Sequence, residues 1–164
     1  MVNGEKSIIL YDNFNHMQEI LIKKLHEYIR ENNPDLLLHL EEEGKVTEYL
    51  SKKISTVDAL LNQQGKEQSA YIIEETCMDV LTQDLRPSKF NYISKVLEED
   101  FEDTYQQLQK SGTLKFEVIN LINRYQPVFD AIGFTEENED SKELKYAITG
   151  SIGEYLEQQV SLKM

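Results

Sequence analysis

The feature that most constrains this chain of 164 residues is how seldom its runs of periodic apolar residues are interrupted. It contains only seven glycines and three prolines among its 164 residues, fewer than the average usage of about 7% glycine and about 5% proline would give. Between them, apolar residues recur at steps of three and four, the spacing of one buried face of an α-helix. Residues 7–11 are the only candidate strand, and a lone strand has no partner. The sequence therefore predicts an all-α fold, a compact bundle of six or seven helices.

Local signals place the ends of these helices. We expect helices at about residues 14–31, 34–43, 46–64, 67–84, 89–111, 113–132 and 142–160. Asn13 or Asn15 is expected to cap the first helix, and Ser88 and Ser141 the fifth and the last, because a short side-chain oxygen accepts hydrogen bonds from first-turn amides. Pro127 lies inside the sixth pattern and removes one backbone hydrogen bond there. We therefore expect that helix to be kinked or broken.

Proline and glycine supply further stops. Pro34 is expected at the first position of the second helix, with Asn33 as its N-cap. Gly44, Gly65 and Gly112 are expected to end the second, third and fifth helices, because glycine enters the left-handed conformation of a C-terminal cap at little cost.

We expect a single helical domain over residues 13–164, preceded by an N-terminal extension of residues 1–12. A chain of this length suits one hydrophobic core and buries about two thirds of the surface that it exposes when unfolded. No stretch rich in glycine, proline or serine suggests a linker between domains.

The chain is acidic throughout. It carries 30 acidic and 17 basic residues, for a net charge of −13, and each of the stretches 1–45, 46–86, 87–112 and 113–164 is acidic. Direct binding to nucleic-acid phosphates depends on clustered Lys and Arg, and it is not expected for a chain that is acidic throughout. Binding to anionic membrane surfaces is disfavoured for the same reason. A basic protein partner, or simple solubility, fits this charge better.

The start of the chain lacks the basic residues of a signal peptide, and its short apolar run is far below the length that such a peptide needs. No stretch approaches the ~20 apolar residues of a membrane span. Cys77 is the single cysteine, so no disulfide within the chain and no thiolate zinc site are expected. These features predict a soluble, cytoplasmic protein.

The three histidines do not have the spacing of metal ligands. His16, His26 and His39 are ten and thirteen residues apart, whereas two ligands on one helix face need a spacing of three or four. His39 shares its predicted face with Glu42 and Glu43, and we expect this to be a solvated helix surface.

The predicted fourth helix directs Cys77 into the core. Ala70, Ile73, Cys77, Val80 and Leu81 recur at helical spacing and are expected to face inward. No histidine follows the cysteine in the sequence, so we interpret it as a small buried residue and not as a nucleophile.

The acidic runs and the glycine pair near the end of the chain are also expected to be structural. Residues 98–103 fan around a helix, and residues 136–140 lie on a loop whose spacing differs from that of a calcium-binding EF-hand. Gly150 and Gly153 lack the lysine of a phosphate-binding loop and fall inside a helical pattern, where glycine often lets another backbone approach closely. The sequence therefore predicts no catalytic, cofactor-binding or metal-binding residue, and no cofactor.

Three motifs carry a resemblance to a known family. They are Asn33-Pro34-Asp35-Leu36, Ser88-Lys89-Phe90 followed by a Leu97 to Phe101 pattern, and Thr149-Gly150-Ser151-Ile152-Gly153-Glu154-Tyr155-Leu156-Glu157. With Pro127-Val128-Phe129, the chain resembles an uncharacterised family of small helical proteins that are encoded on conjugative transposons of Bacteroidetes. The resemblance implies a helical fold and a mobile-element context, and it supplies no activity, cofactor or site residue.

Three functions are compatible with these observations. We expect a non-enzymatic accessory protein of a mobile element that binds another protein, with a homodimer through residues 8–11 and 36–40 as a further use of apolar surface. The first alternative is an acidic DNA mimic that inhibits a restriction enzyme or another DNA-binding enzyme. The second is an enzyme whose site joins Glu42, Glu43 or His39 to Glu98 or Asp103 across helices.

Overall fold

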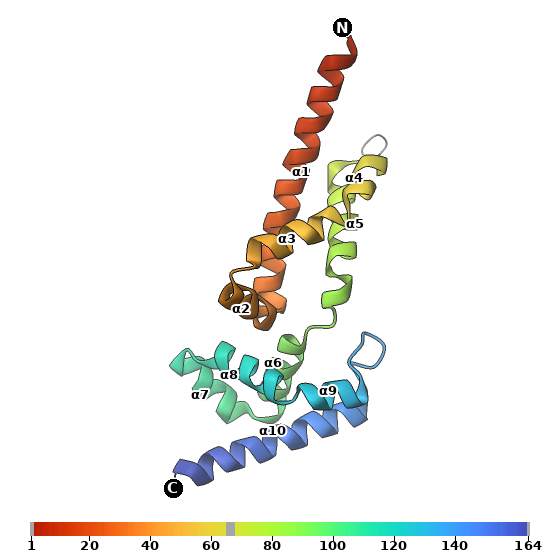
Figure 1. The fold of residues 1–164 in the computed structure, drawn as a ribbon. Helices are drawn as coiled ribbons and strands as arrows, with labels where there is room; N and C mark the ends of the chain where they lie inside the picture. The colour runs from red at the N-terminus through yellow and green to blue at the C-terminus, as the bar shows by residue number, and fades with distance from the viewer. Residues whose placement is uncertain (1, 65–67, 164) are drawn as a thin grey trace. The chain divides into compact units, whose positions relative to one another are not determined.

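The computed structural model describes residues 2–64 and 68–163 (Figure 1). Within these residues the fold consists of ten α-helices and one 3-10 helix, without strands, which confirms the all-α prediction. The helices are more numerous and shorter than the six or seven expected. They are α1 (Val2–Asn32), α2 (Pro34–Glu43), α3 (Val46–Ser55), α4 (Asp58–Gln64), α5 (Ala70–Thr82), the 3-10 helix η1 (Gln83–Leu85), α6 (Lys89–Asp100), α7 (Glu102–Ser111), α8 (Leu114–Arg124), α9 (Gln126–Ile132) and α10 (Lys142–Lys163). Over the described helices, none has the length and apolar character that crossing a membrane requires.

The chain divides into two compact units, which we call unit 1 (Met1–Leu85) and unit 2 (Arg86–Met164). Each has its own cluster of buried apolar residues. This differs from the single domain with one core that we expected over residues 13–164. The physical reason is that the apolar faces of the helices before residue 86 close on one another, as do those of the helices after it.

Unit 1 is built around α1, which packs against α2, α3 and α5. The first turns of α1 extend past the other helices of the unit (Figure 1). The core joins fully or almost fully buried side chains from these helices: Leu21, Leu25 and Ile29 from α1, Leu37 from α2, Leu50 and Ile54 from α3, Val57 and Leu61 from the α4 region, and Ile73, Cys77 and Leu81 from α5.

The expected N-terminal extension, residues 1–12, is helical from Val2 onward, so the prediction of a short lead before the first helix was wrong. Neither Asn13 nor Asn15 caps α1, because both lie within it. Residues 7–11 are likewise helical and do not form a strand. No proline interrupts the chain before Pro34, so the helical backbone hydrogen bonds continue through the apolar turn that residues 8–11 form.

Helix α2 has the predicted bounds. Pro34 opens it, where a missing N–H costs nothing. Gly44 ends it with φ +68° in the left-handed region, and the cap amides bond to the carbonyls of Leu40 and Glu41. Asn33 occupies the N-cap position without a capping hydrogen bond from its side chain.

The expected helix over residues 46–64 is two helices, α3 and α4, which is a correction to the prediction. The hydroxyl of Thr56 donates to the carbonyl of Lys53 at 2.6 Å, giving that carbonyl a partner outside the helical ladder. Val57 follows and is buried in the core of unit 1. The break between α3 and α4 thus coincides with the burial of Val57. Gly65, the predicted stop, lies outside the described residues.

Helix α5 is shorter than predicted, and two of the five residues that were expected to face inward do not. It begins after Ser69, whose hydroxyl accepts from the amide of Ile72 at 3.4 Å. Ile73, Cys77 and Leu81 are buried, as the sequence predicted. Ala70 and Val80, also predicted to face inward, are exposed. Val80 lies about 100° around the helix from Leu81 and outside the stripe of Ile73, Cys77 and Leu81 that packs in the core.

Unit 2 packs α6 against α7 and α8, and α9 against α8 and α10. Its fully buried side chains come from four of these helices: Ile93 and Leu97 from α6, Val118 and Leu121 from α8, Phe129 from α9, and Leu144, Ile148 and Ile152 from α10. The predicted caps are confirmed, since Ser88 accepts from the amide of Asn91 at 3.0 Å and Ser141 from that of Leu144 at 3.2 Å.

The expected long helix over residues 89–111 is broken at Phe101, which is a further correction. The backbone of Phe101 is non-helical, with φ −138°, and separates α6 from α7. Its half-buried ring packs against the core of unit 2 and lies 3.9 Å from where a Cβ on Gly153 would stand. The close approach of another backbone that was expected at the glycine pair is not found among the described residues, since a Cβ at Gly153 would meet only this ring, at ordinary contact distance, and a Cβ at Gly150 would meet nothing within 4 Å.

The predicted disruption near Pro127 is a break. Helix α8 ends at Arg124, and α9 begins at Gln126 with Pro127 as its second residue. After this break, residues 128–132 continue as part of α9.

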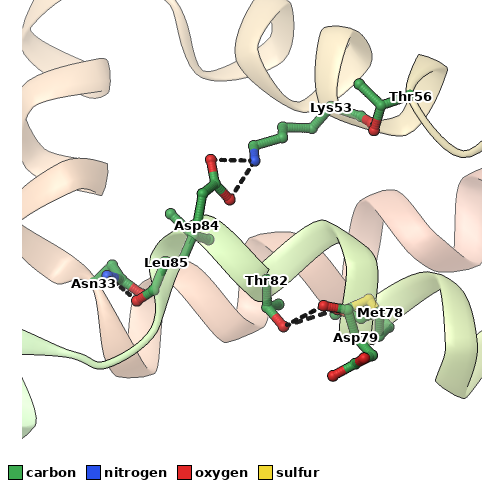
Figure 2. Close-up of polar contacts among 8 residues, drawn as sticks. All are labelled: Asn33, Lys53, Thr56, Met78, Asp79, Thr82, Asp84 and Leu85. Atoms are coloured by element: carbon green, nitrogen blue, oxygen red, sulfur yellow. Dashed lines mark hydrogen bonds and ion pairs between the residues drawn. The ribbon is translucent and has the colours of Figure 1, made fainter. Parts of the chain in front are cut away.

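A group of polar contacts fastens the end of unit 1 (Figure 2). The side-chain amide of Asn33 donates to the carbonyl of Leu85 at 3.2 Å. The ammonium of Lys53 reaches both carboxylate oxygens of Asp84, at 2.5 and 2.6 Å. These contacts tie the 3-10 helix η1 to the junction of α1 and α2 and to α3.

The two cores predict that damage in one unit stays there. Leu25→Ala in α1 and Leu121→Ala in α8 should each lower the free energy of unfolding of their own unit by about 2–5 kcal/mol, because each empties a fully buried site. Amide hydrogen exchange measured by mass spectrometry should rise only in the unit that carries the change. Leu162→Ala, at an exposed position, is the control and should change stability by less than about 0.5 kcal/mol. Equal loss of protection in both units would contradict the division.

The contacts of Figure 2 predict unequal effects on stability. Asn33→Ala should cost about 1–3 kcal/mol, because the carbonyl of Leu85 loses its donor in a partly buried setting. Lys53→Met should cost less than about 1 kcal/mol, because Asp84 is largely exposed and water replaces the pair. Urea unfolding of both variants checks the order, and a larger loss for Lys53→Met would refute it.

Candidate protein-interaction surface

The structure does not gather the histidines into a site. His16 and His39 are exposed, and His26 is half-buried. The imidazole Nε2 of His39 lies 3.4 Å from a carboxylate oxygen of Glu43, on the surface of α2. Over residues 2–64 and 68–163, no group of three or more His, Cys, Asp or Glu side chains is placed to hold a metal ion.

The residues named for an enzyme assembled between helices are divided between the two units. His39, Glu42 and Glu43 belong to unit 1, and Glu98 and Asp103 belong to unit 2. Neither unit by itself therefore contains both parts of that hypothetical site.

The acidic run of residues 98–103 lies where α6 gives way to α7, and its carboxylates are exposed, as expected. Lys145 of α10 approaches Glu99 at 3.4 Å and Asp100 at 3.8 Å, so part of this charge is paired within unit 2. The DNA-mimic hypothesis requires carboxylates that are spaced like phosphates on one surface, and it stays a prediction.

The acidic loop after α9 is organised by an amide side chain. Asn138 accepts from the amide of Thr135 at 2.6 Å and donates to the carbonyl of Gly133 at 2.7 Å. At one end of the loop, Glu136 pairs with Arg86 at 3.5 Å. These bonds give the loop its shape and use one of its carboxylates.

A polar cluster joins α8 to α10. The hydroxyl of Tyr155 accepts from the side-chain amide of Asn120 at 3.1 Å, and the guanidinium of Arg124 lies 5.1 Å from the ring centroid of Tyr155. Burial, followed by the neighbouring Glu117, raises the pKa of the Tyr155 phenol. The cluster fastens two helices of unit 2 together.

Cys77 is completely buried in α5, as the sequence predicted. Burial raises the pKa of its thiol above the ordinary value, because the thiolate would lie in an apolar setting. A raised pKa is the opposite of what activates a nucleophilic cysteine.

Exposed apolar side chains provide the more informative signal. In the part of the chain that the structure describes, seven large apolar side chains are exposed: Tyr71, Ile72 and Val80 on α5, Phe116 on α8, and Tyr146, Val160 and Leu162 on α10. Single exposed apolar residues are ordinary on protein surfaces, and α5 differs because it carries three within ten residues.

Two of these residues share one face of α5 with a threonine. Ile72, Thr76 and Val80 are spaced at four and four, so they form one row along the helix. The hydroxyl of Thr76 donates to the carbonyl of Ile72 at 2.8 Å, which satisfies its donor within the helix. Ile72 is 46% and Val80 40% exposed, and Tyr71 beside them is 71% exposed. We call Ile72, Thr76 and Val80 the α5 ridge.

This surface was not predicted, because Val80 was expected to face the core. The available signal was that apolar residues occur as adjacent pairs, Ile72 with Ile73 and Val80 with Leu81. On a helix, neighbours in sequence point about 100° apart, so the two members of a pair do not share one narrow buried stripe.

The burial of Cys77 predicts a pH dependence. Since its folded-state pKa is raised, the stability that the protonated thiol contributes is fully present below about pH 8.5, the ordinary value for an unfolded chain, and is lost as pH rises through the folded-state pKa. The free energy of unfolding, measured with urea, should therefore fall as pH rises above about 8.5. Between that pH and about pH 10, where tyrosines begin to ionise, the fall should be smaller for the Cys77→Ala variant. A thiol reagent should react with native protein much more slowly than with unfolded protein, and equal rates would contradict burial.

The comparisons with known proteins bear on family and fold. Comparison with curated proteins gives no match. A solved structure, described as the crystal structure of protein PG0816 from Porphyromonas gingivalis, is similar with a TM-score of 0.56 and 23% identity over 92% of this chain and 95% of that one. It supports the helical fold. A family model described as "Domain of unknown function (DUF1896)" matches residues 18–160, and the chain therefore belongs to that family, as the resemblance to an uncharacterised family had implied.

Proposed function

We propose that this protein is a non-enzymatic accessory protein of the cytoplasm that acts by binding another protein through the α5 ridge and Tyr71. The observation that carries the proposal is the exposure of Tyr71, Ile72 and Val80 on one helix. Removing apolar surface from water stabilises a complex by about 25 cal/mol per Å². Clustered exposed apolar side chains are therefore typical of interaction surfaces.

The remaining exposed apolar side chains support this choice of helix. Phe116 and Tyr146 lie on α8 and α10 respectively, and Val160 and Leu162 lie in the last turns of α10. None of them shares a row with a second large exposed apolar residue at a spacing of three or four, as Ile72 and Val80 do through Thr76.

The mobile-element setting is a second part of the proposal. Its support is the set of motifs shared with transposon-encoded proteins, of which the stretch from Thr149 to Glu157 is the most specific. Membership in a family of unknown function is compatible with this setting and adds no activity.

Site-specific photo-crosslinking in the native host tests the proposal. A benzophenone amino acid placed at Tyr71 should give a discrete crosslinked species with another protein. Tyr146 is the matched control, since it is 73% exposed against 71% for Tyr71 and also lies on a helix. Adding Ile72→Glu should remove the species formed from position 71, because a carboxylate on the ridge opposes burial.

Circular dichroism of the Ile72→Glu variant separates loss of binding from loss of fold. Crosslinks that form equally well from both tyrosine positions, or that survive Ile72→Glu in a folded protein, would rule out the ridge as the binding surface.

A further inference from the structure

We propose that two copies of this chain associate through the outer face of α10, around Gly150, as an antiparallel pair of helices. This inference goes beyond the proposed function, because it concerns unit 2 and a surface that the α5 ridge does not include. It follows from one row of residues on α10, whose shape and charges complement those of the same row in a second copy.

One row of four residues, spaced at intervals of four, runs along the exposed side of α10. Its members, which we call the α10 row, are Lys142, Tyr146, Gly150 and Glu154. All four are exposed, and Tyr146 is 73% exposed. Helix α10 packs through a different side, which carries the fully buried Leu144, Ile148 and Ile152. The α10 row is therefore a surface that unit 2 leaves uncovered.

Packing within unit 2 does not require a glycine at position 150. Among the described residues, nothing lies within 4 Å of where a Cβ on Gly150 would stand, and the residue has no positive φ that would favour glycine. Glycine inside a helix is destabilising relative to alanine, so the position lowers stability without a gain within the unit. A second helix supplies that gain, because the missing side chain leaves a depression beside the exposed ring of Tyr146.

A two-fold antiparallel arrangement matches the α10 row to itself. When the axis passes midway between positions 146 and 150, Tyr146 of each copy lies opposite Gly150 of the other. A large side chain then fills a depression at two equivalent places. Rows at intervals of four are also the ridges through which helices most commonly pack. The two rings supply the apolar surface that the contact buries.

Charge favours the same arrangement. The same axis places Lys142 of each copy opposite Glu154 of the other, so an ion pair lies on either side of the crossing. Both side chains are exposed, and no ion pair within the part of the chain that the structure describes engages either of them. A parallel pair would instead set each of these charges against its own counterpart. Opposite charges therefore select the antiparallel pair.

A second copy is not opposed by the net charge of the chain at this helix. Although the whole chain carries −13, α10 contains three acidic and three basic residues. The contact involves one helix from each copy and is small, so we expect a weak, reversible dimer. Sedimentation equilibrium of the full-length protein should give a dimer Kd on the order of 10–100 μM, and the Kd should rise with salt.

Two variants at Gly150 separate association from folding. Gly150→Leu fills the depression and should raise the dimer Kd at least about tenfold. Gly150→Ala should raise the Kd less, and at concentrations where the protein is monomeric it should raise the midpoint of thermal unfolding by about 2–4 °C, because alanine is the better helix former. Phe116→Ala is the control, since it removes an exposed aromatic ring from α8, and it should change the Kd by less than about twofold.

A charge swap tests the register of the pair. The single variants K142E and E154K should each raise the Kd about fivefold, because each sets like charges against one another across the axis. The double variant K142E/E154K restores opposite charges and should return the Kd to within about twofold of its original value. Tyr146→Ala should raise the Kd about tenfold, and no second charge change should restore it.

Several results would overturn this inference. A protein that stays monomeric at about 1 mM, a dimer that Gly150→Leu leaves unchanged, or a charge swap without restoration would each exclude this pairing. A crosslink from position 146 to a different protein would assign the α10 row to that protein. A covalent dimer formed from position 146 supports the pairing and differs in mass from a crosslink to another protein. The comparison with position 71 therefore still decides the proposed function separately.

Discussion

The burial of Ile73, Cys77 and Leu81 against α1 sets the rotation of α5, and the exposed surface of unit 1 depends on that rotation. With this stripe facing the core, the residues that precede Ile73 and Leu81 lie about 100° away around the helix. Ile72 and Val80 are therefore exposed by the same packing that stabilises the unit. The ridge is held by the core, so its geometry persists for as long as the core remains intact.

Local chemistry made a large part of the fold predictable. The stop at Gly44, the caps at Ser88 and Ser141, and the break near Pro127 each depend on one residue and its nearest backbone groups. Such signals can be recognised without knowledge of what the helix packs against. The all-α class followed from the same periodicity.

What the sequence did not disclose depends on contacts between distant residues. The breaks at Thr56 and Phe101 accompany side-chain packing in their units, and the division into two units depends on which helix faces close together. The candidate surface was missed for the same reason. The periodicity predicted a buried stripe from Ile73 to Leu81. It could not decide whether Val80 faces the core, because that depends on how α5 packs against α1.

The division of the chain also has a consequence for its synthesis. Each core is made of residues that are contiguous in the sequence, those before and those after the boundary at residue 86. Unit 1 can therefore complete its core while the rest of the chain is still on the ribosome, because none of its buried partners remains to be translated. Contacts between near neighbours in sequence also keep the entropy of loop closure small. A chain organised in this way exposes its unfinished apolar faces only briefly as it emerges.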